Sequence, residues 1–97
     1  MIFECKPDTP PRLLEVDDFK AFKLVLNGYP QGQTPFIEGV RYIEDQHAFI
    51  GQQQVLEAAG SPDATWRAAF AAMVEKAAKY GWVEPGTQAI KAHIQWS

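Results

Sequence analysis

The sequence predicts an α+β fold in which one long helix, in the C-terminal half, packs on one face of an antiparallel β-sheet of three to five strands. Three observations predict it: an amphipathic helical segment, an alternating segment after it, and β-prone segments before it. The chain has 97 residues, the length of one ordinary domain, and no repeat or long linker divides it. We therefore expect a single domain, residues 1–97, with the order β-β-β-α-β.

The first expected strand lies within Phe19–Asn27, and this segment is ambiguous. As a strand, Phe22, Leu24 and Leu26 alternate with the residues between them. As a helix, the segment has a capping residue and a terminating glycine, but Leu24 points away from the apolar stripe. We favour the strand. With a helix here and a strand at Ile2–Cys5, the order becomes β-α-β-β-α-β, which is ferredoxin-like.

The next two expected strands are Val40–Ile43 and Ala48–Val55. The polar segment Glu44–His47 separates them and fits a four-residue hairpin loop. The proline- and glycine-rich segments Pro7–Pro11 and Gly28–Pro35 are read as breaks between elements.

The clearest element is a helix over Pro62–Tyr80. Ser61 can cap its start and Pro62 suits the first helical position. Gly81 can adopt the left-handed conformation that ends a helix, with Trp82 as the apolar residue after it. One apolar stripe recurs at helical spacing and contains Trp66, Phe70, Met73, Val74 and Ala77. Capping, periodicity and the many alanines all favour the helix.

The last expected element is a strand over Ala89–Trp96. It follows Glu84–Thr87, whose Pro-Gly centre is typical of a type II turn. Apolar residues alternate with Lys91, His93 and Gln95, which is the pattern of a half-buried strand.

Composition and charge narrow the possible functions. The formal net charge is −3, and nine Lys and Arg residues are scattered along the chain. A nucleic-acid or anionic-membrane partner needs a basic cluster, so we expect neither. The single cysteine, Cys5, permits no internal disulfide, and no apolar leader follows Met1. These features predict a cytoplasmic protein.

The candidate catalytic residues are Tyr42, Asp45 and His47, near the expected hairpin loop, and His93 on the last strand. A histidine beside a carboxylate can act as a general base near neutral pH. A charged turn is also simply typical of a solvated surface. No metal-ligand spacing, phosphate-binding glycine loop or nucleophile motif occurs, so we expect no metal and no cofactor.

The candidate binding residues are Tyr29, Phe36, Arg41 and Trp96. Tyr29 and Phe36 lie in a turn-rich loop, where aromatic side chains can anchor a ligand or simply cover the core. Trp96 lies at the end of the last strand, and tryptophan is enriched at interfaces. The leading hypothesis is a non-catalytic interaction or small-ligand-binding module that acts as a homodimer or accessory subunit. The alternative is a small enzyme that uses His47 or His93 as general acid/base in a pocket at a subunit boundary.

Overall fold

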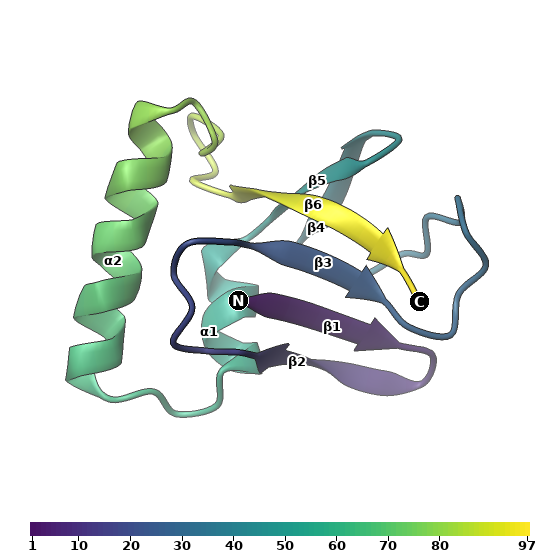
Figure 1. Ribbon diagram of the computed structural model, residues 1–97, viewed down its shortest axis with the longest axis horizontal. Helices are drawn as coiled ribbons and strands as arrows, with labels where there is room; N and C mark the ends of the chain where they lie inside the picture. The colour runs from purple at the N-terminus through teal and green to yellow at the C-terminus, as the bar shows by residue number, and fades with distance from the viewer.

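The computed structural model describes residues 1–97 and contains one six-stranded β-sheet and two helices (Figure 1). The strands are β1 (Ile2–Lys6), β2 (Thr9–Leu14), β3 (Lys23–Leu26), β4 (Val40–Glu44), β5 (His47–Ile50) and β6 (Ile90–Trp96). The helices α1 (Gln52–Ala58) and α2 (Ala64–Lys79) lie between β5 and β6 in the chain. The order along the sheet is β2-β1-β3-β6-β5-β4.

The predicted antiparallel sheet with the order β-β-β-α-β is wrong, and so is the ferredoxin-like alternative. The sheet is mixed: β3 pairs in parallel with both β1 and β6, and the other pairs are antiparallel. The observed order is β-β-β-β-β-α-α-β. Local patterns predict strands but not their partners, and β3 pairs with segments about 20 and 70 residues away in the chain.

The strand β2 is one reason for the error, because its two prolines read as a break. Pro10 and Pro11 instead lie in an edge strand, next to an irregularity in the pairing with β1 between Glu4 and Lys6. An edge strand or a bulge is where a sheet tolerates residues without an N–H group. The strand at Ile2–Cys5, expected only in the alternative fold, is present as β1.

The helix α1 is the second reason that the predicted fold was wrong. The alternation over Ala48–Val55 predicted one long strand, but the strand ends at Ile50 and the chain turns into a helix at Gln52. Gly51 precedes the helix in an extended conformation and provides no side-chain cap. Val55 is fully buried in the core. A helix this short is marginal by itself, and the packing of Val55, Leu56 and Ala58 on the core stabilises it.

The helix α2 and the strand β6 match their sequence signals closely. Asp63, rather than Ser61, caps α2 by accepting a hydrogen bond from the Trp66 N–H. At the other end Gly81 has φ +77°, and the Trp82 N–H donates to the Ala77 carbonyl at 3.0 Å, which ends the helix as predicted.

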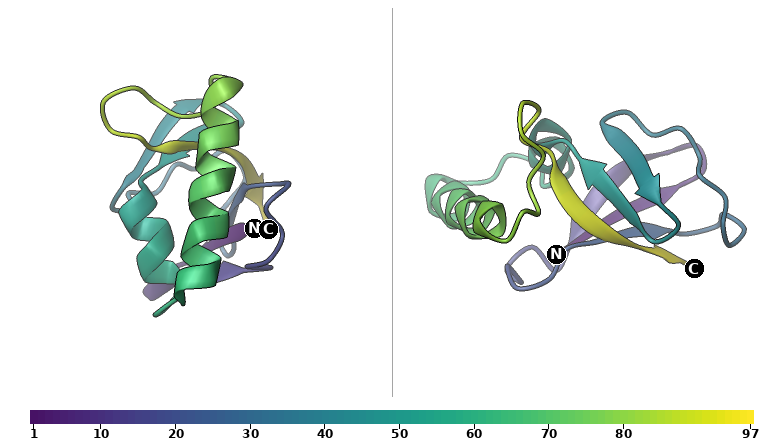
Figure 2. Two further views of the ribbon diagram at one scale, coloured as in Figure 1. Left: turned by 90° about the vertical axis from the view of Figure 1, so that its left-hand side faces the viewer. Right: turned by 90° about the horizontal axis from the view of Figure 1, so that it is seen from above.

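The position of α2 differs from the prediction. Instead of lying across one sheet face, it stands beyond the ends of the strands, close to the start of β1 (Figures 1 and 2). Only Phe70 and Ala77 of its residues are buried. The strand β6 keeps the expected alternation, with Ile90, Ala92 and Ile94 buried.

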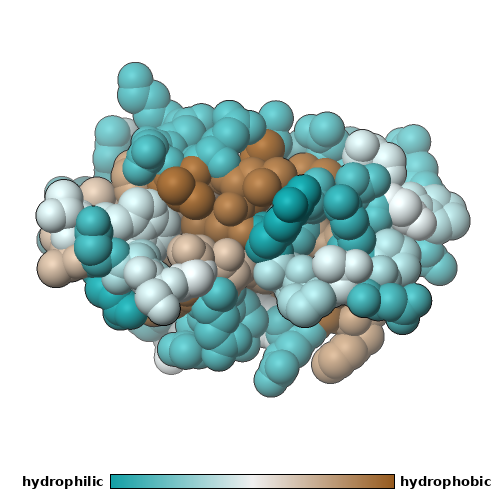
Figure 3. Space-filling model, turned by 90° about the horizontal axis from the view of Figure 1, so that it is seen from below, coloured by the Kyte–Doolittle hydropathy of each residue, from teal (hydrophilic) through white to brown (hydrophobic).

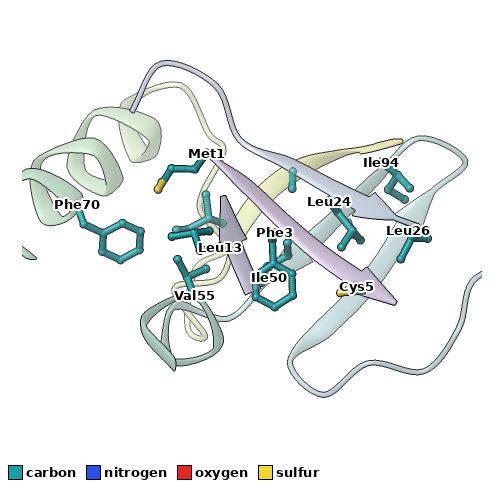
Figure 4. Packing of buried hydrophobic residues seen from close by; sticks show 13 residues of the cluster. Met1, Phe3, Cys5, Leu13, Leu24, Leu26, Ile50, Val55, Phe70 and Ile94 are labelled. Atoms are coloured by element: carbon teal, nitrogen blue, oxygen red, sulfur yellow. The ribbon is translucent and has the colours of Figure 1, made fainter. Parts of the chain in front are cut away.

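The core lies on one face of the curved sheet, which we call the inner face, and α1 closes it (Figure 2). It contains 13 buried apolar residues, among them Phe3, Leu24, Leu26 and Ile50, each with no exposed surface (Figure 4). Met1 reaches from β1 towards Phe70 of α2, which joins the helix to the sheet (Figure 4). Seen from below, apolar groups also gather in the centre of the surface, with hydrophilic groups around them (Figure 3).

Candidate functional site

A cleft of about 570 Å³ opens between α2, the start of β6 and the segment that leads into β3. This volume lies within the range of roughly 300–1,000 Å³ that is usual for small-molecule sites. The residues that line it come from five parts of the chain: Phe19, Lys20, Ala21, Phe22, His47, Met73, Lys76, Ala77, Tyr80, Trp82, Ile90, Lys91, Ala92 and His93.

The wall formed by residues 19–22 is held in place by hydrogen bonds to backbone carbonyls. The amino group of Met1 donates to the carbonyls of Asp18 and Ala21, at 2.7 and 2.6 Å. Partial burial of this amino group lowers its pKa. The indole N–H of Trp66 donates to the Val16 carbonyl at 2.8 Å, and its ring lies 5.8 Å from that of Phe19. This wall is therefore attached both to the sheet and to α2.

The mouth of the cleft carries two exposed aromatic side chains. The rings of Tyr80 and Trp82 stack with their centroids 5.0 Å apart, and these residues are 62% and 50% exposed. The left-handed turn at Gly81 directs the chain so that both rings lie beside the cleft. Trp82, the apolar residue after the end of α2, is therefore a surface residue. Exposed stacked rings offer a flat apolar surface to a ligand.

Apart from the phenol of Tyr80, the titratable groups that line the cleft are all basic. Lys20, Lys76 and Lys91 line it together with His47 and His93, and no aspartate or glutamate does. The chain as a whole carries a net charge of −3, so this composition differs from the average of the molecule. Cationic groups beside an apolar wall suit an anion that has an apolar body.

The two histidines come together through the register of the sheet. Lys23 of β3 is the partner of His93 of β6, and His93 is the partner of His47 of β5. The rings of His47 and His93 lie edge to face with their centroids 5.3 Å apart. Nδ1 of His47 also contacts a carboxylate oxygen of Glu44, which orients the ring. We call Lys23, His93 and His47 the basic row.

Tyr42 and Asp45 do not join His47 in this cleft. Tyr42 lies opposite Ala48 in the register and therefore faces the core, where its hydroxyl donates to the Pro35 carbonyl at 2.7 Å. Burial raises the pKa of Tyr42 to about 12. Asp45 is exposed in the two-residue turn between β4 and β5, which replaces the four-residue loop that we expected.

The four predicted binding residues lie apart from the cleft. Arg41 pairs with Glu84 and lies over the ring of Phe49, 5.3 Å from its centroid. The indole of Trp96 donates to the Gln33 carbonyl at 2.9 Å. The other two, Tyr29 and Phe36, line a smaller depression of about 420 Å³; Tyr29 also packs against the core, and Phe36 is 92% exposed.

Cys5 faces the core and is 2% exposed. Burial, and then the nearby charge of Glu4, raises the pKa of its thiol to about 12. A thiol with this pKa is not a nucleophile near neutral pH. No group of three or more histidine, cysteine, aspartate or glutamate side chains is arranged to hold a metal ion.

The sequence analysis identified the two histidines but missed the three lysines and the aromatic rings around them. Lys91 and His93 lie on the same polar face of the expected strand Ala89–Trp96, which was a partial indication of this site. Lys20 and Lys76 are isolated in the sequence, and only the fold brings them to the same cleft.

Comparison of the chain with protein-family models, with curated proteins and with solved structures found no match in any of the three. Neither helix has the length and apolar character needed to cross a membrane.

Proposed function

We propose that this protein is a non-catalytic module that binds a small organic anion with an aromatic or otherwise apolar body. The observation that carries the proposal is the composition of the cleft: three lysines, two histidines and several aromatic rings, without a carboxylate. In this arrangement the apolar body contacts the aromatic residues at the mouth, and the anionic group is attracted by the cationic side chains.

A matched pair of probes tests this proposal. Naphthalene-2-carboxylate and its neutral amide have nearly the same shape and differ in charge. We expect the carboxylate to bind at least tenfold more tightly, about the gain that one charge-assisted hydrogen bond provides. Binding is followed by two-dimensional NMR, in which the signals of residues 19–22, 80–82 and 90–93 should shift.

Two lysines of α2 form the matched variants. Lys76 lines the cleft, whereas Lys79 is exposed on the same helix and does not. We expect Lys76→Gln to weaken carboxylate binding severalfold and Lys79→Gln to leave it unchanged. Equal affinity for the carboxylate and the amide, or equal effects of the two variants, would remove the proposal.

As part of the same proposal, the module acts in the cytoplasm as a homodimer or as an accessory subunit of a larger protein. The side chain of Phe36, which is 92% exposed, favours this assembly, because aromatic residues are enriched at interfaces. Light scattering at increasing protein concentration tests it. A strict monomer that gains no partner when co-purified at native abundance contradicts this part and leaves ligand binding standing.

The second candidate function is acid–base catalysis in the same cleft. The contact between Glu44 and His47 favours it, because a carboxylate that orients a histidine is a common arrangement for a general base. It predicts turnover of an ester such as 2-naphthyl acetate, with a rate that falls strongly in His47→Gln. A rate that stays the same in wild type and His47→Gln leaves binding as the sole function.

A further inference from the structure

The basic row extends from the cleft along the face of the sheet opposite the core, which we call the open face. Its three side chains come from adjacent strands, at positions that are paired in the register: Lys23 on β3, His93 on β6 and His47 on β5. Adjacent strands lie about 4.8 Å apart, so three neighbouring side chains on one face can contact one small group. The core does not use these side chains, since His93 and Lys23 are exposed and His47 is half-buried.

We infer that this basic row is the subsite for the ligand's anionic group, and that one oxyanion accepts hydrogen bonds from both imidazoles. The inference rests on the proposed function and specifies which part of the cleft holds the charge. An oxyanion has several lone pairs and can accept from two donors at once, whereas a neutral group of the same size offers less to two adjacent imidazolium rings.

Geometry supports His47 and His93 as joint donors. Their ring centroids are 5.3 Å apart and their planes make an angle of 79°, so one small group can lie within reach of both rings. Glu44 contacts Nδ1 of His47, which leaves Nε2 of that ring for a ligand. His93, whose side chain is exposed, supplies the second imidazole donor.

The charges around the two rings come from every neighbouring element. Lys23 lies beside His93 on β3, Lys91 precedes it on β6, Lys20 and Lys76 line the cleft from the segment before β3 and from α2, and Glu44 is the one carboxylate in contact. An anion placed here offsets the repulsion among these cations. Binding should therefore be coupled to protonation of the two imidazoles, because only the protonated ring carries a positive charge and a donor on both nitrogens.

A sulfonate probe tests the inference, because a sulfonate stays fully charged across this pH range and only the protein titrates. We expect the Kd of naphthalene-2-sulfonate for the wild-type protein to rise at least tenfold between pH 5.5 and pH 8. The ring-proton signals of His47 and His93 should titrate at higher pH with the sulfonate than without it. Replacement of either ring, His47→Gln or His93→Gln, should reduce the pH dependence by about half.

Lys91→Gln is the matched control, since it removes a nearby positive charge and leaves both imidazoles in place. It should weaken sulfonate binding at every pH and leave the slope unchanged. A wild-type Kd that is independent of pH, together with a weakening by Lys76→Gln, overturns the subsite and leaves the proposed function intact. No binding of either naphthalene anion at any pH removes both.

Discussion

The two faces of the sheet differ in almost every physical respect. On the inner face, Phe3, Leu24 and Ile94 lie side by side across three strands and are at most 3% exposed. One residue earlier along the same strands, Ile2, Lys23 and His93 form the corresponding row on the open face, and two of the three are polar. Successive residues of a strand face opposite sides of the sheet, so the same strands place apolar side chains on the inner face and polar side chains on the open face.

This difference between the two faces predicts which substitutions affect stability and which affect ligand binding. The inner face supplies the apolar burial that stabilises the fold, and none of the 13 core residues carries a charged side chain. The open face carries ion pairs and titratable side chains that contribute little to stability and are free to bind. We therefore expect stability to follow the inner face and ligand affinity to follow the open face and the cleft.

The greatest loss of stability is expected from substitution of Leu24, which is fully buried on the inner face. Leu24→Ala should lower the free energy of unfolding by about 3 kcal/mol, through lost burial and the cavity that remains. The neighbouring Lys23→Ala, on the opposite face and exposed, should cost about 0.5 kcal/mol or less. Urea denaturation measures both, and Leu24→Val serves if Leu24→Ala does not fold. Similar losses for the two alanine variants would contradict the division between the faces.

The next effect concerns Cys5, whose thiol faces the core and has a pKa raised to about 12 by burial. Native protein at pH 8 should react with iodoacetamide ~100-fold or more slowly than protein unfolded in guanidinium, because the thiolate is both scarce and enclosed. Mass spectrometry of timed samples measures the rate, and glutathione in the two buffers is the control. Comparable rates would show that the core opens readily at β1.

The smallest effect concerns Glu4 on the open face. Its carboxylate accepts a hydrogen bond from Nε of Arg12 at 2.8 Å, and this bond holds the pKa of Glu4 below its ordinary value of 4.5. Because the pKa is lower in the folded chain than in the unfolded chain, ionised Glu4 stabilises the fold above about pH 4.5. This contribution is lost as the pH falls through the lower, folded value.

The variant Glu4→Gln should therefore lose about 1 kcal/mol or less at pH 7, since Arg12 is largely solvent-exposed. The difference from wild type should shrink as the pH falls below 4.5. Urea midpoints at pH 7 and at pH 3.5 measure it, with Glu75→Gln on the exposed side of α2 as the control. A difference that persists unchanged at pH 3.5 would assign the effect to packing rather than to charge.

Several elements of this fold were predictable because their signals are local. The stripe that includes Trp66 and Phe70, together with the glycine at 81, specified α2 to within two residues at each end. The alternation from Ile90 to Trp96 identified β6 and the face that it buries. The histidines of the site were also identified, His47 in the expected hairpin loop and His93 on the last expected strand.

Other elements were not predictable from local patterns. The segment Gln52–Ala58 contains good helix formers, but a helix this short forms only because Val55 is buried in the core. The prolines of Thr9–Leu14 are tolerated because that strand lies at the edge of the sheet, and edge position is a property of the whole sheet.

Local patterns in the sequence predicted α2 and β6 and the residues of both that face the core. The parallel pairing of β3 with β1 and β6, and hence the row of Lys23, His93 and His47, follows only from the assembled sheet. Capping and periodicity depend on residues within a few positions of one another in the sequence. Strand pairing depends on which distant apolar faces can be buried together, so a local pattern does not specify it.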